Sequence, residues 1–177
     1  MINEKLLTDC KARVRSAQRQ LYEYMSPKLY QTCRRYLKQQ ADIEEIMADA
    51  FYTIFTKLDQ LRDVAAFDAW ARRIAVNLCL SQLRKSGSLD IYLEDMKQEP
   101  QPQPLVSRLE EHDLLRLLDQ LPAGCRMIFN LFAIEGYSHK EIAAMLQISE
   151  GTSKSQLSFS KTKLQSLVNR FYYLKEN

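Results

Sequence analysis

Apolar residues recur at spacings of three and four along most of the chain, a pattern typical of helices that bury one face. The longest unbroken stretch runs from Asp42 to about Leu58, and a second runs from about Phe67 to Lys85. Few residues alternate with period two, and only four glycines and five prolines are present. The pattern therefore predicts an all-α fold. In the first stretch we expect a buried face of Ile43, Ile46, Met47, Ala50, Phe51, Ile54, Phe55 and Leu58, and in the second one of Phe67, Trp70, Ala71, Ile74 and Leu78.

Residues 138–165 contain two helix starts separated by a tight turn. Ser138 and Glu141 have the spacing of a capping box, in which each side chain accepts a hydrogen bond from the other residue's amide. The turn at 146–148 is followed by Ser149, which predicts the cap of a second helix. Earlier in the chain, Ser26-Pro27 predicts another helix start.

The second helix of this pair is basic and rich in hydroxyl and amide groups. We expect Leu157 and Leu164 to face inward. Two helices joined by a short turn, the second one basic, favour a helix-turn-helix that reads the DNA major groove. An ordinary helical hairpin with a solvated basic face is the alternative. The side chains expected to face solvent or a ligand are Lys154, Ser155, Gln156, Phe159, Lys161 and Lys163.

Two further polar rows lie outside the apolar faces of the N-terminal helices. Asp42, Glu45 and Asp49 form an acidic row, which is either a solvated face or a surface for a basic partner protein. Arg73, Asn77, Leu80 and Arg84 share a side of the next helix, with Arg72 and Lys85 nearby. That second row suits a nucleic-acid strand as well as it suits plain solvation.

Charge and proline divide the chain into three parts. Residues 1–85 carry 15 Lys and Arg against 10 Asp and Glu, whereas residues 86–104 carry one against four and hold three of the five prolines. Residues 105–177 are nearly balanced, with nine against eight. The sequence therefore predicts two small helical domains, residues 1–85 and 105–177, joined by a flexible acidic linker at 86–104. Two basic blocks also suit two contacts with phosphate backbones.

The remaining chemistry is sparse. The four cysteines form no CxxC pair and the two histidines lie at no ligand spacing, so we expect reduced thiols, no metal and no cofactor. Cys79 and Cys125 fall in helical apolar patterns and are expected to fill the core. No phosphate-cradling glycine loop or nucleophile-base pair is visible, which argues against an enzyme. No apolar run approaches a membrane span, so a cytoplasmic protein without membrane insertion is expected.

Three segments in order resemble bacterial sigma factors of the extracytoplasmic-function (ECF) group. DIEEIMADAFYTIF at 42–55 resembles the helix that binds core RNA polymerase, and FDAWARRIAVNLCLSQLRK at 67–85 resembles the promoter-melting helix. The segment LPAGCRMIFNLFAIEGYSHKEIAAMLQISEGTSKSQLSFSKTKL at 121–164 resembles the C-terminal domain. The resemblance implies a factor that directs core RNA polymerase to promoter DNA and helps to open it. It also makes an anti-sigma protein a candidate partner.

The same resemblance implies roles for particular residues. Core polymerase would dock on Asp42, Glu45, Asp49 and Phe55. The minus-ten element would be bound by the loop at 59–66 and the helix after it, through Arg62, Asp63, Arg72, Arg73, Asn77, Arg84 and Lys85. The minus-thirty-five element would be read by Glu150, Gly151, Thr152, Lys154, Ser155, Gln156, Phe159 and Lys163.

Several positions depart from the usual ECF pattern. Ser153 replaces an inward valine, so its hydroxyl needs a partner, for which a backbone carbonyl one turn earlier is the expected choice. Gln156 and Phe159 replace frequent basic residues, which weakens the expected attraction to phosphate. The other departures are Ala48 for glutamine, Ser81 for aspartate and Gln147 for the glycine of the turn.

Three other functions stay open on the sequence alone. A helix-turn-helix regulator that acts without core polymerase would share the C-terminal motif, but would need a sensory N-terminal domain, usually with strands. An enzyme such as a nucleic-acid hydrolase would need a site that the residues do not offer. A purely structural helical adaptor would bind no DNA in a sequence-dependent way.

Overall fold

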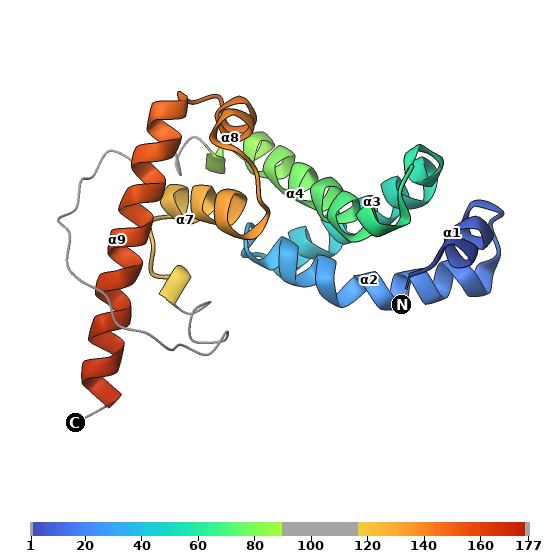
Figure 1. Ribbon diagram of the computed structural model, residues 1–177, viewed down its shortest axis with the longest axis horizontal. Helices are drawn as coiled ribbons and strands as arrows, with labels where there is room; N and C mark the ends of the chain where they lie inside the picture. The colour runs from blue at the N-terminus through green and yellow to red at the C-terminus, as the bar shows by residue number, and fades with distance from the viewer. Residues whose placement is uncertain (1, 90–116, 176–177) are drawn as a thin grey trace. The chain divides into compact units, whose positions relative to one another are not determined.

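The computed structural model describes residues 2–89 and 117–175, with side chains as far as residue 170, as two compact helical units (Figure 1). The first unit is Met1–Ser86 and the second is Gly87–Asn177. Within the described ranges every regular element is a helix, which confirms the predicted all-α fold. Most of the predicted linker at 86–104 lies outside the described residues, as do Leu109, Leu114 and Leu115 at the start of the predicted C-terminal domain.

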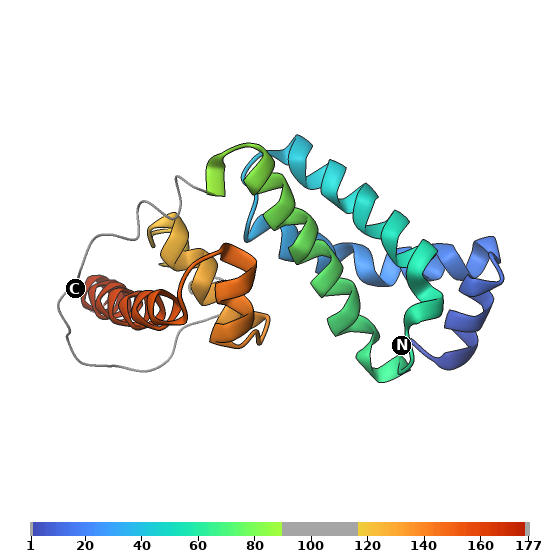
Figure 2. The same cartoon turned by 90° about the horizontal axis from the view of Figure 1, so that it is seen from above.

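The N-terminal unit contains four α-helices. They are α1 (Glu4–Lys11), α2 (Arg15–Arg34), α3 (Gln40–Lys57) and α4 (Phe67–Lys85). Two short 3-10 turns, η1 (Leu58–Gln60) and η2 (Val64–Ala66), connect α3 to α4. The helices α2, α3 and α4 pack against one another in all three pairs, and α1 packs on α2 (Figure 2).

The predicted apolar faces form the core of this unit, with one change in α4. Along α3 the predicted residues are buried except Met47 and Phe55, which are partly exposed. Along α4 the buried arc is wider, because this helix packs against two neighbours at once. Leu80, expected on the outward row, is therefore buried. Trp70, Ile74 and Leu78 are only partly buried, while the buried arc of α4 comprises Phe67, Ala71, Ala75, Val76, Cys79, Leu80 and Leu83.

The helix start predicted at Ser26-Pro27 is wrong. Helix α2 passes through Pro27 without interruption, and its first residue is Arg15. Met25 and Leu29, on either side of the proline, are fully buried against the rest of the unit. Packing of that continuous apolar face thus outweighs the loss of one backbone hydrogen bond at an exposed position.

Polar groups also join α2 to α4. The carboxylate of Asp68 accepts hydrogen bonds from Lys28 Nζ at 2.5 Å and from Tyr24 Oη at 3.1 Å. Deeper in the same interface, the fully buried thiols of Cys33 and Cys79 share a hydrogen bond, which together with burial raises the pKa of Cys79. All four cysteines are free thiols, as predicted, and all four are buried, although core positions were predicted only for Cys79 and Cys125.

Besides short helical pieces at 88–89 and 117–118, the described part of the C-terminal unit contains three α-helices and one π-helical turn. They are α7 (Ala123–Phe129), the π-turn η4 (Asn130–Ile134), α8 (His139–Leu146) and α9 (Glu150–Lys175). Helix α9 packs against both α7 and α8 (Figure 1). One cluster of its core is formed by Leu117, Leu118, Leu121 and Leu164, with Phe129, Leu167 and Val168 against it.

Candidate DNA and polymerase surfaces

The capping box at the start of α8 is confirmed. Ser138 Oγ accepts a hydrogen bond from the Glu141 amide at 3.3 Å, and the Ser138 amide donates to Glu141 Oε2 at 2.8 Å. The preceding turn ends at Gly136, whose φ of +77° is readily adopted by glycine. The first helix of the predicted helix-turn-helix is therefore defined at its N-terminus by its own side chains.

The turn between α8 and α9 depends on a left-handed residue. Gln147 has φ 57° and ψ 41°, a conformation that costs about 1–2 kcal/mol for a residue other than glycine. The amide of Ile148 donates to the carbonyl of Ala143 at 3.1 Å and completes the helix end. Glycine suits this position because it adopts the left-handed conformation without strain. Gln147 adopts the same conformation under strain.

Ser149 caps the second helix, as predicted. Its Oγ accepts a hydrogen bond from the Thr152 amide at 2.9 Å and lies 2.9 Å from Thr152 Oγ1. The two helices are thus separated by residues 147–149 alone. This is the length of turn expected for a helix-turn-helix.

The solvent face of α9 carries most of the predicted DNA-reading residues. Lys154 is exposed and lies 3.8 Å from Glu150 Oε2, while the exposed Ser155 hydroxyl donates to the Thr152 carbonyl. Ser158 is exposed on the same side, a residue that the sequence analysis missed although its spacing from Ser155 places it there. Of the other predicted residues, Glu150, Gly151 and Lys163 are exposed, and Thr152 and Phe159 are partly buried.

The exposure predicted for Gln156 is wrong. Its side chain is only 9% exposed, and its Oε1 accepts a hydrogen bond from Cys125 Sγ at 3.0 Å. The reason is its position on the helix: residue 156 precedes the inward Leu157 and faces α7. The amide group is therefore a contact within the unit and is turned away from solvent.

The partner expected for Ser153 is also wrong. The Ser153 hydroxyl is fully buried, and its Oγ lies 2.9 Å from Nδ1 of His139 at the start of α8. No sequence pattern predicts this pair, because His139 lies fourteen residues away from Ser153 and stands next to a helix cap.

The acidic row of the N-terminal unit is accessible. Glu45 and Asp49 are exposed on α3, and the partly exposed Asp42 accepts a hydrogen bond from Gln82 Nε2 at 3.4 Å. Phe55 is partly buried and its ring stacks on Phe51, with centroids 6.1 Å apart. Tyr52, which the sequence analysis did not select, is 71% exposed on the same helix.

The predicted minus-ten residues occupy the η2 loop and one side of α4. Asp63 Oδ1 accepts a hydrogen bond from the Ala65 amide at 2.9 Å and so caps η2. Arg73 and Asn77 are exposed one turn apart on α4, close enough along the helix to contact one strand together. Arg62, Arg84 and Lys85 are exposed as well, whereas Arg72 is partly buried.

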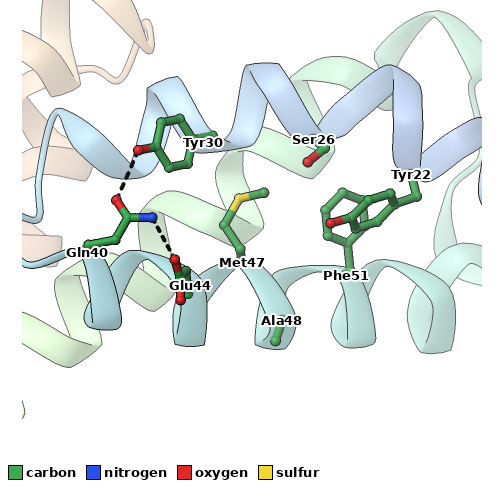
Figure 3. A pocket seen from close by; sticks show the side chains of 8 residues that line it. All are labelled: Tyr22, Ser26, Tyr30, Gln40, Glu44, Met47, Ala48 and Phe51. Carbon is green, nitrogen blue, oxygen red and sulfur yellow. Dashed lines mark hydrogen bonds between the residues drawn. The ribbon is translucent and has the colours of Figure 1, made fainter.

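A groove of about 420 Å³ lies between α2 and α3 (Figure 3). Tyr22 and Phe51 pack ring against ring at one end, with centroids 4.4 Å apart. At the other end Tyr30 Oη donates to Gln40 Oε1 at 3.0 Å, and Gln40 Nε2 donates to a Glu44 carboxylate oxygen at 2.7 Å. Met47, Ala48 and Ser26 complete the lining. The groove is therefore apolar and aromatic at one end and hydrogen-bonded at the other.

Among the described residues, no cluster of three or more His, Cys, Asp and Glu side chains is arranged to hold a metal ion. None of the helices in the described ranges is long and apolar enough to cross a membrane.

The geometry defines a helix-turn-helix protein with a second, separate helical unit bearing an acidic row and a basic row. Two family models match the chain: Sigma-70 region 2 at residues 21–88 and Sigma-70 region 4 at residues 111–164. Together they cover well over half of the chain, one in each unit. The chain therefore belongs to the ECF group of the sigma-70 family, and that family is not one of enzymes.

Two relatives found by sequence agree with this family. The ECF sigma factor SigE of Mycolicibacterium smegmatis is 28% identical over 157 residues, covering 84% of this chain and 60% of the relative. The ECF sigma-E factor of Escherichia coli K12 is 28% identical over 147 residues, covering 73% of this chain and 77% of the relative.

Two solved structures share the fold at 23% identity. CnrH, solved with the cytosolic domain of CnrY, has a TM-score of 0.51 over 93% of this chain and 96% of the CnrH chain. RpoE of Bartonella quintana, solved with the anti-sigma factor NepR, has a TM-score of 0.52 over 85% and 96%.

Proposed function

We propose that this protein binds core RNA polymerase in the cytoplasm and directs it to specific promoters, whose opening it assists. The observation that carries the proposal is the pairing, in one chain, of a region 2 match on the N-terminal unit with a complete helix-turn-helix in the C-terminal unit. A regulator that acts without polymerase would share only the helix-turn-helix. The region 2 match over residues 21–88 therefore favours a sigma factor.

In this proposal the N-terminal unit has two tasks. Glu45 and Asp49, with Asp42 and Phe55 beside them, dock on a basic surface of core polymerase, because exposed like charges in a row attract a partner of opposite charge. The η2 loop with Arg73 and Asn77 binds an unstacked base of the minus-ten element. Unstacking costs a few kcal/mol per base, which a binding site on the protein can offset.

The C-terminal unit reads the minus-thirty-five element through the exposed side of α9. Lys154 and Lys163 supply salt-sensitive contacts to phosphate, and Ser155 and Ser158 present hydroxyls that can donate to or accept from base edges. Gln156, which is turned inward, is left out of this surface. An anti-sigma protein is proposed as the controlling partner, which the complex of RpoE with the anti-sigma factor NepR supports.

Transcription with purified core polymerase tests the proposal. We expect the full chain to produce discrete transcript starts from genomic fragments that share an upstream motif. Asp49→Lys should reduce polymerase binding several-fold, whereas Glu23→Lys, an equal charge change at an exposed position of α2, should leave it close to that of the unsubstituted chain. No promoter-specific start from any fragment would reject the sigma-factor function.

A further inference from the structure

The buried face of α9 contains three polar side chains, although this helix packs against two others. Ser153, Gln156 and Ser160 follow one another at i, i+3 and i+7, and both serine side chains are fully buried. Each contacts a defined partner on another helix: Ser153 Oγ meets His139 Nδ1, Gln156 Oε1 meets Cys125 Sγ, and Ser160 Oγ lies 2.9 Å from the Cys125 carbonyl. Hydrogen bonds are directional, so these contacts specify one rotation of the helix more narrowly than apolar packing does.

The His139 ring is fixed from two sides. It stacks on Phe132 with ring centroids 4.5 Å apart and an interplanar angle of 22°, and its Nδ1 lies 2.9 Å from Ser153 Oγ. Phe132 belongs to η4, His139 to α8 and Ser153 to the first turn of α9. One side chain therefore ties three consecutive elements of the unit together.

We propose that His139 and Ser153 form a positioning pair that sets the rotation of the first turn of α9, and so determines promoter preference without touching DNA. Lys154 and Ser155 follow Ser153 directly, and one residue step turns a helix by about 100°. A modest rotation of α9 would break the hydrogen bond to His139 and redirect both exposed side chains. The proposal rests on the proposed reading of promoter DNA by α9.

Two substitutions at Ser153 isolate the contribution of the hydroxyl group, because threonine and valine have the same shape. Ser153→Thr keeps the hydroxyl and adds a methyl group, whereas Ser153→Val replaces the hydroxyl of threonine by a second methyl group. The readout is transcription by the full chain with core polymerase on a library of minus-thirty-five sequences. We expect Ser153→Thr to keep the sequence preference, and Ser153→Val to lower the ratio between the best sequence and its single-base variants about threefold to tenfold. Ser166→Thr and Ser166→Val, at an exposed position of α9, control for branching at Cβ.

A substitution of the histidine tests the other member of the pair. His139→Phe keeps a ring for stacking on Phe132 and removes Nδ1, so it should lower the ratio between the best sequence and its single-base variants. The double variant of His139→Phe with Ser153→Val should lower this ratio no more than either single variant. Equal ratios for the Thr and Val variants, or additive losses in the double variant, would overturn the proposal.

Amide NMR shifts of the full chain separate this proposal from the proposed function. We expect the amides of Lys154 and Ser155 to shift in Ser153→Val but to stay close to their original positions in Ser153→Thr. If the unsubstituted chain directs no promoter-specific initiation, the sigma-factor function fails, and the NMR comparison alone then decides whether the pair sets the position of α9. Unchanged amides in Ser153→Val would reject it.

Discussion

The thiol of Cys125 on α7 donates to Oε1 of Gln156 on α9, over a distance of 3.0 Å inside the C-terminal unit. The contact joins a helix whose cysteine is 1% exposed to the helix expected to read DNA. Gln156, which the sequence predicts to contact DNA, is therefore part of the core.

Replacing Gln156 by alanine should therefore affect stability more than sequence preference. Loss of the buried amide leaves the Cys125 thiol without this acceptor and opens a cavity, so we expect a loss of about 1–3 kcal/mol in the free energy of unfolding. Urea denaturation of the full chain measures it. Ser158→Ala, at an exposed position two residues further along, should change stability by less than about 0.5 kcal/mol. A change of less than about 0.5 kcal/mol in the free energy of unfolding for both variants would contradict the inward position of Gln156.

The turn at Gln147 offers a stabilising substitution. Gln147→Gly removes a left-handed strain of about 1–2 kcal/mol but adds freedom to the unfolded chain, so a net gain of about 0.5–1 kcal/mol is expected. Thermal unfolding of both proteins provides the measurement. Gly136→Ala should act in the opposite direction by about 1 kcal/mol, because φ there is +77° although space for the methyl group is open. Changes of the same sign in both variants would exclude backbone strain as the cause.

Substitution of the exposed Asn77 should impair promoter opening without impairing polymerase binding. Asn77 lies one turn from Arg73 on α4, whereas the acidic row belongs to α3. Asn77→Ala should slow opening, measured by permanganate reactivity of unpaired thymines, by about tenfold, which corresponds to loss of one or two hydrogen bonds to a flipped base. Affinity for core polymerase should stay within a factor of two. Equal losses in the two assays would remove Asn77 from the proposed minus-ten surface.

The contact between Lys28 and Asp68 predicts a dependence of stability on alkaline pH. Burial lowers the pKa of Lys28, but hydrogen bonds and charge from Asp68 and Tyr24 raise it by more, so its net pKa lies above the ordinary 10.5. A raised pKa stabilises the folded chain fully below 10.5, and this stabilisation is lost as the pH rises through the folded value.

Comparing Lys28→Met with the unsubstituted chain tests this dependence. The difference in urea midpoint should be present at neutral pH and should shrink above about pH 10.5. Lys38→Met, at an exposed position after α2, should show no such trend. A difference that stays constant across the alkaline range would contradict the role of the Asp68 contact.

Sequence periodicity predicted α3 and α4 because each buries an apolar stripe, and the cap at Ser138 was predictable because its partners lie three residues apart. The inward turn of Gln156 and the pairing of Ser153 with His139 were not predictable. Both depend on polar partners far away in the sequence, and a hydrophobicity pattern assigns polar residues to the surface by default. Leu80 was misplaced for a related reason, since the pattern contains no information on how many neighbours α4 has. The passage of α2 through Pro27 likewise depends on tertiary packing.

The π-turn η4 limits how this protein can change during evolution. Its i to i+5 hydrogen bond, from the Glu135 amide to the Asn130 carbonyl at 3.0 Å, accommodates one residue more than an α-helical turn would hold. Deleting a single residue there would let α7 continue as a regular helix, but it would turn the following chain by about 100° and displace His139 from Phe132. Related chains should therefore tolerate changes of side chain between residues 130 and 134 far better than changes of length.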